Sequence, residues 1–151
     1  MMCERRYRVD EQWYNLRPDA LSAYRVGQQH PRFWLEWDRG TMNVRDLAIK
    51  FSSYASYITS REWAREFTRI PLLICVAPDV GQERRIHRVA QGRLAHLAGV
   101  EVWTTTEELM NRSGSLASIW LQCLPQHCHV MQSSGSQRRL SFDAISGKAG
   151  D

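Results

Sequence analysis

The apolar run IPLLICVA, from Ile70 to Ala77, constrains the fold more than any other segment of this 151-residue chain. Pro78 and Asp79 end the run. A strand with one solvated face alternates apolar and polar residues, so an unbroken run of this length predicts a strand that is buried on both faces. Such a strand needs covering layers on both sides, which indicates an α/β domain.

Helical spacing is clearest just before this run and just after it. Asn43 followed by Asp46 is typical of an N-terminal cap, and apolar residues at three- and four-residue intervals then predict a helix over about 44–59. Asp79 is placed to cap a second helix that reaches about Ala98, and Gly99 stands where a helix commonly ends. In both helices the apolar residues gather on one side, which predicts that this side is buried.

Further strands are expected on both sides of these helices. Segments 19–26 and 32–38 are rich in aromatic and β-branched residues and are separated by a loop that contains Gly and Pro, which predicts an antiparallel hairpin. The apolar segment 100–104 predicts another strand. A short helix that ends near Met110 follows, and segment 116–121 is a last apolar strip.

These elements predict one domain, because a chain of this length forms a single core of ordinary size. The expected fold is α/β, with a central mixed sheet of about four strands flanked by helices. Residues 1–15 are interpreted as a short helix or an irregular arm. Residues 16–124 form the domain, and residues 125–151, with their Ser-, Gly- and Gln-rich composition, are expected to be a disordered tail.

Charge and hydropathy narrow the class of protein only slightly. Twenty Lys and Arg residues against sixteen Asp and Glu residues give a net charge of +4, a mild preference for polyanions. The sequence contains no apolar stretch of the roughly 20 residues that a membrane-spanning helix needs, and its start lacks the apolar core of a secretion signal. We therefore expect a cytoplasmic protein with no membrane partner.

Arginine is the predominant basic residue, and its planar side chain pairs well with phosphate. The second predicted helix carries several arginines close together, and one more arginine, Arg39, directly follows the predicted hairpin. An ordinary solvated helix face explains the helical arginines equally well. The candidate contacts to a DNA backbone are Arg39, Arg84, Arg85 and Arg88.

Acidic residues concentrate around the predicted hairpin. Alternation along the second strand places Trp34, Glu36 and Asp38 on one face, and pairing of the two strands can bring Asp19 close to them. Such a cluster is costly unless it is solvated, protonated or neutralised by a cation, and Mg²⁺ prefers oxygen ligands. The alternative is that these acids are solvated or paired with neighbouring arginines.

These segments together resemble a known family. Pro18-Asp19, then Glu36 to Asp38 on a strand, then a helix with Lys50 resembles the PD-(D/E)XK nuclease-like superfamily. More closely, the strings RPDAL, FWLEWDRGT, KFSSYASY, PLLICV and VWTTTEEL resemble the replication-relaxation family, over roughly residues 16–121. The resemblance implies a restriction-endonuclease-like core and a role in plasmid or mobile-element DNA replication, with DNA and replication proteins as partners.

Carried over residue by residue, the resemblance implies that Asp19 and Glu36 bind Mg²⁺. Asp38 stands where the superfamily has its lysine, so this strand does not supply that residue. Lys50 on the following helix is a candidate replacement, and Tyr54 one turn later is similar to the tyrosine of a Q-x-x-x-Y helix motif in RecB-like nucleases. The candidate catalytic set is therefore Asp19, Glu36, Asp38, Lys50 and Tyr54.

Other interpretations remain open at this level. The chain can be a metal-dependent DNA nickase, a non-catalytic DNA-binding or replication-complex module with the same fold, or a decayed mobile-element fragment. Lys50 and Tyr54 also fit an ordinary helix flank. Members of the family often carry a winged-helix region ahead of this domain, so the resemblance implies a truncated or divergent copy. A zinc site at residues 123–129 is disfavoured, because its Cys and His residues are too close together for tetrahedral binding.

Overall fold

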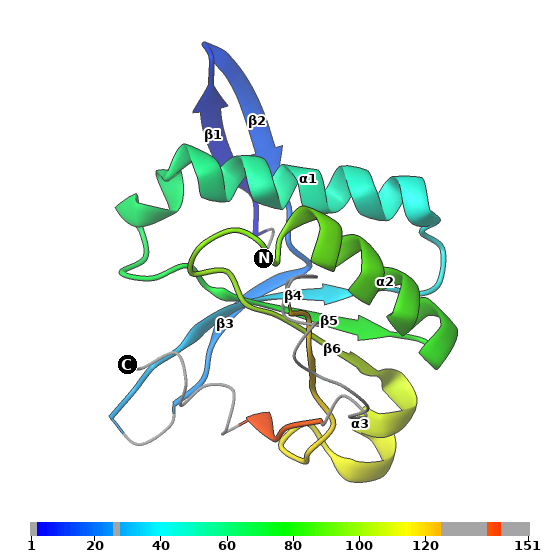
Figure 1. Ribbon diagram of the computed structural model, residues 1–151. Helices are drawn as coiled ribbons and strands as arrows, with labels where there is room; N and C mark the ends of the chain where they lie inside the picture. Colours follow the sequence, from blue (N-terminus) through cyan, green and yellow to red (C-terminus); the bar gives the residue numbers. More distant parts are fainter. Residues whose placement is uncertain (1–2, 26–27, 125–138, 143–151) are drawn as a thin grey trace.

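The computed structural model describes residues 3–25, 28–124 and 139–142, and Figure 1 shows the arrangement of the elements. The elements in chain order are β1 (Arg5–Val9), β2 (Gln12–Leu16), β3 (Ala20–Ala23), β4 (Arg32–Trp37), α1 (Val44–Ser60), the 3-10 helix η1 (Glu62–Arg65), β5 (Leu72–Ala77), α2 (Val80–Arg93), β6 (Val102–Thr106), α3 (Glu107–Ser113) and β7 (Leu121–Gln122).

Five of the strands form a mixed sheet in the order β3-β4-β5-β6-β7. The pair β3–β4 is antiparallel, whereas β4, β5 and β6 run parallel to one another and β7 is antiparallel to β6. All six residues of β5 are buried, which confirms the prediction from the apolar run. The mixed α/β architecture is thus confirmed.

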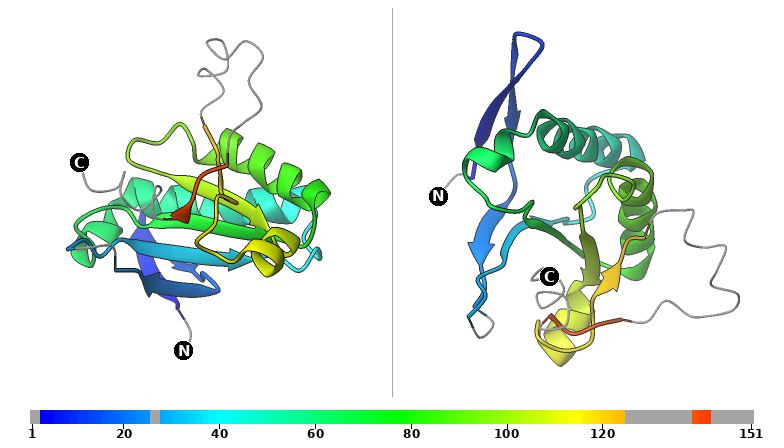
Figure 2. Two further views of the ribbon diagram at one scale, coloured as in Figure 1. Left: turned by 90° about the horizontal axis from the view of Figure 1, so that it is seen from below. Right: turned by 60° about the vertical axis from the view of Figure 1, so that its left-hand side comes forward.

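The two long helices lie side by side on one face of this sheet, and α3 lies on the other (Figures 1 and 2). Residues of β5 alternate between two hydrophobic clusters, because successive side chains of a strand point to opposite faces. Leu73 and Cys75 belong to the cluster under α1 and α2, and Ile74 and Val76 belong to the cluster on the opposite face. The sheet therefore separates two cores.

The capping pattern at Asn43 is present as predicted. The Asn43 side chain accepts a hydrogen bond of 3.0 Å from the Asp46 backbone N–H, and the Asp46 carboxylate accepts one of 3.3 Å from the Asn43 N–H. Both bonds satisfy amides that the first helical turn leaves without partners. They fix the start of α1 close to the end of β4.

Residues 1–15 were interpreted as a helix or an irregular arm, and this interpretation is wrong: β1 and β2 form an antiparallel hairpin. Asp10 and Glu11 have positive φ angles of 46° and 68°, which is the backbone of a tight two-residue turn. Alternation then directs Tyr7 and Leu16 into the core. The near-helical spacing of apolar residues in this segment was misleading.

Two element boundaries also differ from those expected. α2 ends at Arg93, before Ala98, because Leu94 leaves helical geometry. The following strand, β6, covers Val102–Thr106 where 100–104 was expected. Gly99 has a φ of 75°, so it serves the turn between these two elements.

The expectation of a disordered tail over 125–151 lies outside the described residues, apart from 139–142. In this short segment Leu140 pairs with Trp120 in an antiparallel bridge, and Phe142 is buried against the second core. Among the described residues, no helix has both the length and the apolar character needed to cross a membrane.

Candidate functional site

A pocket lies at the end of the β3–β4 hairpin, beside the start of α1. It is lined by Asp19, Trp37, Asp38, Arg39, Thr41, Met42 and Lys50. Ligands of open α/β sheets bind at the carboxyl ends of the strands, which is where β4 ends. The fold therefore brings four of the residues predicted from the sequence to one place: Asp19, Asp38, Arg39 and Lys50.

Asp19 is held at this pocket by the strand pairing. Its backbone N–H donates to the Leu35 carbonyl at 3.1 Å, and its Oδ2 accepts a hydrogen bond of 2.7 Å from the Trp37 N–H. Because β3 runs antiparallel to β4, the residue before β3 lies beside the end of β4. Asp19 is exposed, so it is the accessible carboxylate of the pocket.

Glu36 is buried behind this pocket, on the face of β4 that α1 covers. The Lys50 Nζ forms an ion pair with Glu36 Oε2, and the Tyr54 hydroxyl donates a hydrogen bond to Oε1. Lys50 and Tyr54 are one helical turn apart, so both reach the same carboxylate. The structure thus places both helical candidates on Glu36.

Burial raises the pKa of Glu36 from 4.5 to about 7, and the nearby charge of Asp19 adds to the rise. The charge of Lys50 and the hydrogen bonds from Lys50 and Tyr54 act in the opposite direction. Burial and the proximity of Glu36 raise the pKa of Tyr54 well above its ordinary value. Tyr54 therefore remains a hydrogen-bond donor at neutral pH, whereas Glu36 changes between its protonated and its ionised form near neutral pH.

Asp38 is also buried, and both of its oxygens have partners within the protein. Oδ1 accepts a hydrogen bond of 2.8 Å from the Gly40 N–H, and Oδ2 accepts one of 2.5 Å from the Gln82 side chain. Gln82 also donates to the Met42 carbonyl at 2.9 Å. Asp38 thus ties the loop after β4 to α2.

Sequence reasoning missed Gln82 as part of this site. The available signal was the position of Gln82, three residues after the Asp79 cap and on the side of α2 that carries the buried Ile86 and Ala90. Gln82 is 4% exposed and carries the contact between α2 and the pocket loop. A buried amide of this kind is retained only when its hydrogen bonds are satisfied.

A search of known proteins gives one family match, over residues 3–73. These residues match the replication-relaxation family. The match confirms the resemblance inferred from the sequence, although it starts earlier and ends earlier than the segment 16–121. No curated protein and no solved structure matches this chain.

The matched segment, residues 3–73, contains all the predicted catalytic residues but ends before α2. Within the part of the chain that the structure describes, no group of three or more His, Cys, Asp or Glu side chains is arranged to hold a metal ion. The disfavoured zinc cluster falls mainly outside the described residues. Its described member, Cys123, lies 3.2 Å from His87 Nδ1, and burial raises the pKa of its thiol.

The candidate DNA-binding arginines lie on two elements. Arg84, Arg85 and Arg88 are exposed on α2, and Arg85 donates to the Gln82 side chain at 3.2 Å. Arg39 is exposed at the wall of the pocket. Gln82 is hydrogen-bonded to both Arg85 and Asp38, so it connects the exposed arginines of α2 to the pocket loop.

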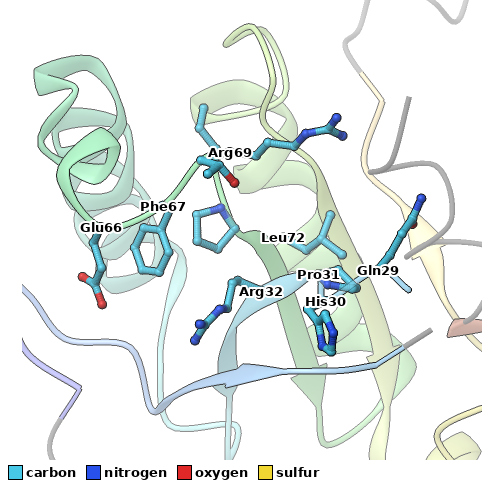
Figure 3. Close-up of a pocket in the computed structure, with 11 residues that line it drawn as sticks. Gln29, His30, Pro31, Arg32, Glu66, Phe67, Arg69 and Leu72 are labelled. Atoms are coloured by element: carbon cyan, nitrogen blue, oxygen red, sulfur yellow. The ribbon is translucent and has the colours of Figure 1, made fainter. Parts of the chain in front are cut away.

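A second hollow lies at the opposite ends of the strands, between segments 29–32 and 66–72 (Figure 3). It contains Arg32, Arg69 and His30 but none of the residues predicted as catalytic. Its acidic residue, Glu66, is paired with Arg5 at 2.7 Å. The family pattern and the buried carboxylates both favour the pocket at Asp19 as the candidate site.

The raised pKa of Glu36 predicts that stability falls as the pH rises. Between pH 4.5 and about 7 the folded protein holds a proton that the unfolded chain has released. The free energy of unfolding therefore decreases over this range, by up to about 3 kcal/mol. Urea unfolding at a series of pH values measures the decrease, and Glu36→Gln should flatten it.

Glu108→Gln is the control for this prediction, because Glu108 is exposed on α3. This variant should keep the pH dependence of the wild-type protein. If Glu36→Gln and the wild-type protein lose stability in parallel between pH 4.5 and 7, Glu36 is not the group that titrates.

Proposed function

We propose that this protein processes DNA during replication or relaxation, and that the pocket at Asp19 is directed at a phosphodiester. The family match over residues 3–73 supports the DNA role. The observation that carries the site is the ion pair between Lys50 and Glu36 beside Asp19, at the pocket where β4 ends. This arrangement joins two acids and a lysine, as the superfamily resemblance implies.

The proposal includes a nuclease-like core of the PD-(D/E)XK kind. The β3–β4 hairpin carries Asp19 and Glu36, and α1 leads from it to the parallel strand β5. The lysine comes from α1 and not from β4, where Asp38 occupies its position. The contact between Lys50 and Glu36 supports the view that the helix supplies the missing lysine.

In this proposal Asp19 and Glu36 hold Mg²⁺. The residues fit, because Mg²⁺ commonly takes one or two carboxylates together with water and substrate phosphate. Carboxylate oxygens accept more than one contact each, so a cation is compatible with the hydrogen bonds from Trp37 and Tyr54, but it would share Glu36 Oε2 with Lys50. When bound, the ion supplies polarisation of the phosphoryl group and an activated water.

Apart from the metal ion, the protein's own side chains bind and orient the DNA in this proposal. Lys50, at the pocket wall, places a positive charge where a phosphate oxygen would enter. Tyr54 fixes the orientation of Glu36 through its hydrogen bond. Arg39 and the exposed arginines of α2 then hold the backbone on either side.

Conversion of supercoiled plasmid to nicked circles in the presence of Mg²⁺ tests this function. Asp19→Asn keeps the shape of the side chain but removes its charge, so nicking should fall by about 100-fold or more. Glu62→Gln is the control, because Glu62 lies on η1, after the far end of α1, and its ion pair with the exposed Arg65 contributes little. Equal nicking by Asp19→Asn and the wild-type protein would contradict the proposal.

A second candidate is a non-catalytic DNA-binding module. The observation that favours it is that Asp38 is fully bonded within the protein and that Glu36 is already paired with Lys50. In that case the plasmid shifts in a mobility assay but stays intact. A decayed fragment of a mobile element would show neither nicking nor a specific shift.

A further inference from the structure

The β1–β2 hairpin has one face that contacts the body of the protein and one face that does not. It extends beyond α1, away from the sheet (Figure 1). Tyr7 and Leu16 are buried in the core under α1. Arg6, Arg8 and Trp13 lie on the opposite, outward face, because side chains alternate along each strand.

The outward face forms a compact group of two guanidinium groups and one indole. Arg8 is paired with Trp13 in the register of the hairpin, and Arg6 is two positions away on the same face. The guanidinium carbons of Arg6 and Arg8 lie 4.6 and 5.9 Å from the centre of the Trp13 ring. Trp13 is 58% exposed, the most exposed of the large aromatic side chains in the described ranges.

The charge of this face is not neutralised within the described residues. The two other arginines of this region are paired with acids: Arg5 with Glu66, and Arg17 with Glu4. Arg6 and Arg8 form no ion pair in the described part of the chain. Their positive charge is therefore available to a partner.

We propose that this face binds single-stranded nucleic acid. Arg6 and Arg8 contact phosphates, and Trp13 stacks on an unpaired base. Exposed aromatic rings beside basic residues bind single strands in this way, because every base has a flat face and every nucleotide carries a phosphate. The face of a base in a duplex is covered by its neighbours, so an indole gains stacking only from a single strand.

The turn of the hairpin limits where the strand lies. Asp10 and Glu11 are exposed at this turn and repel phosphates. The nucleic acid therefore crosses the middle of the hairpin, over Trp13. This site is separate from the pocket at Asp19 and needs no metal, so it goes beyond the function proposed above.

Binding of a fluorescent single-stranded oligothymidine in EDTA, measured by anisotropy, tests the proposal. Trp13→Ala should weaken binding roughly tenfold, since it removes the stacking on one base. Trp13→Phe should restore much of the affinity, because a phenyl ring also stacks. Arg6→Ser with Arg8→Ser should weaken binding and reduce its dependence on salt.

A control variant and the assay conditions separate this site from others. Arg112→Ser removes an exposed arginine on α3 and should leave binding unchanged. The binding assay contains no Mg²⁺ and reads only affinity, so a failed nicking assay and a failed binding assay are distinguishable. The proposal is overturned if Trp13→Ala binds the single strand as tightly as the wild-type protein, or if it loses as much affinity for a duplex of the same length as for the single strand.

Discussion

Replacing Trp34 by alanine should lower the free energy of unfolding by about 4 kcal/mol, the range expected for removing a buried indole. Trp34 lies on β4 under α1 and is 0% exposed. Its ring centre lies 5.4 Å from Tyr54, 5.9 Å from Tyr57 and 6.1 Å from Phe67. The substitution leaves a cavity between the sheet and α1 that these rings cannot fill without moving.

Urea unfolding of the Trp34→Ala protein measures this loss. Trp13→Ala removes the same side chain from an exposed position and should cost less than about 1 kcal/mol. The comparison separates the loss of packing from the loss of an indole as such. A cost for Trp34→Ala no greater than that for Trp13→Ala would show that β4 does not pack under α1 as described.

Replacing Arg139 by alanine should lower the free energy of unfolding by about 3 kcal/mol, because it leaves a buried carboxylate without its charge partner. The two guanidinium nitrogens of Arg139 donate to Glu83 at 2.9 and 2.7 Å. Arg139 also donates to the Ile119 carbonyl at 2.7 Å, and Thr104 donates to Glu83 at 3.1 Å. The Glu83 side chain is 3% exposed, so its charge depends on these contacts within the protein.

Arg65→Ala provides the matched control for the Arg139 variant. Arg65 pairs with Glu62 at 3.2 Å, but its side chain is 81% exposed, and exposed ion pairs contribute only about 0–1 kcal/mol. Both variants are compared by urea unfolding at the same pH. If Arg139→Ala costs no more than Arg65→Ala, residues 139–142 are not held to the sheet by this pair.

The parts of the fold that the sequence predicts are those set by local patterns. The apolar run before Pro78 identifies β5, and the cap at Asn43 identifies the start of α1. Alternation on β4 correctly predicts that Trp34 and Glu36 share a buried face, and Asp38, directly after the strand, is buried as well. These patterns depend on neighbouring residues alone, which is why a single sequence is enough to read them.

The parts that the sequence does not predict depend on contacts between distant residues. The hydrogen bond between Gln82 and Asp38 joins residues 44 positions apart, and the pair of Arg139 and Glu83 joins residues 56 positions apart. Neither leaves a periodic pattern along the chain. The β1–β2 hairpin was missed for a related reason, since its alternation becomes evident only once α1 is known to cover Tyr7.

The sequence predicts several residues of the candidate site but not their hydrogen-bond partners. Asp19, Lys50 and Asp38 do line one pocket. However, the sequence gives no sign that Asp38 is engaged by Gln82 and the Gly40 backbone. The distinction between a carboxylate that faces a pocket and one that anchors a loop requires the positions of its partners.

The packing of residues 139–142 determines the order in which the two cores can close during synthesis. The cluster under α1 and α2 draws its members from residues 7–123, whereas the opposite cluster includes Phe142. Ribosomes release the chain from its N-terminus, so the first cluster can consolidate while the other still lacks an aromatic side chain. Until Phe142 packs, the underside of the sheet presents Trp120 and Phe33 without this neighbour, and exposed apolar surface of this kind favours aggregation of a nascent chain.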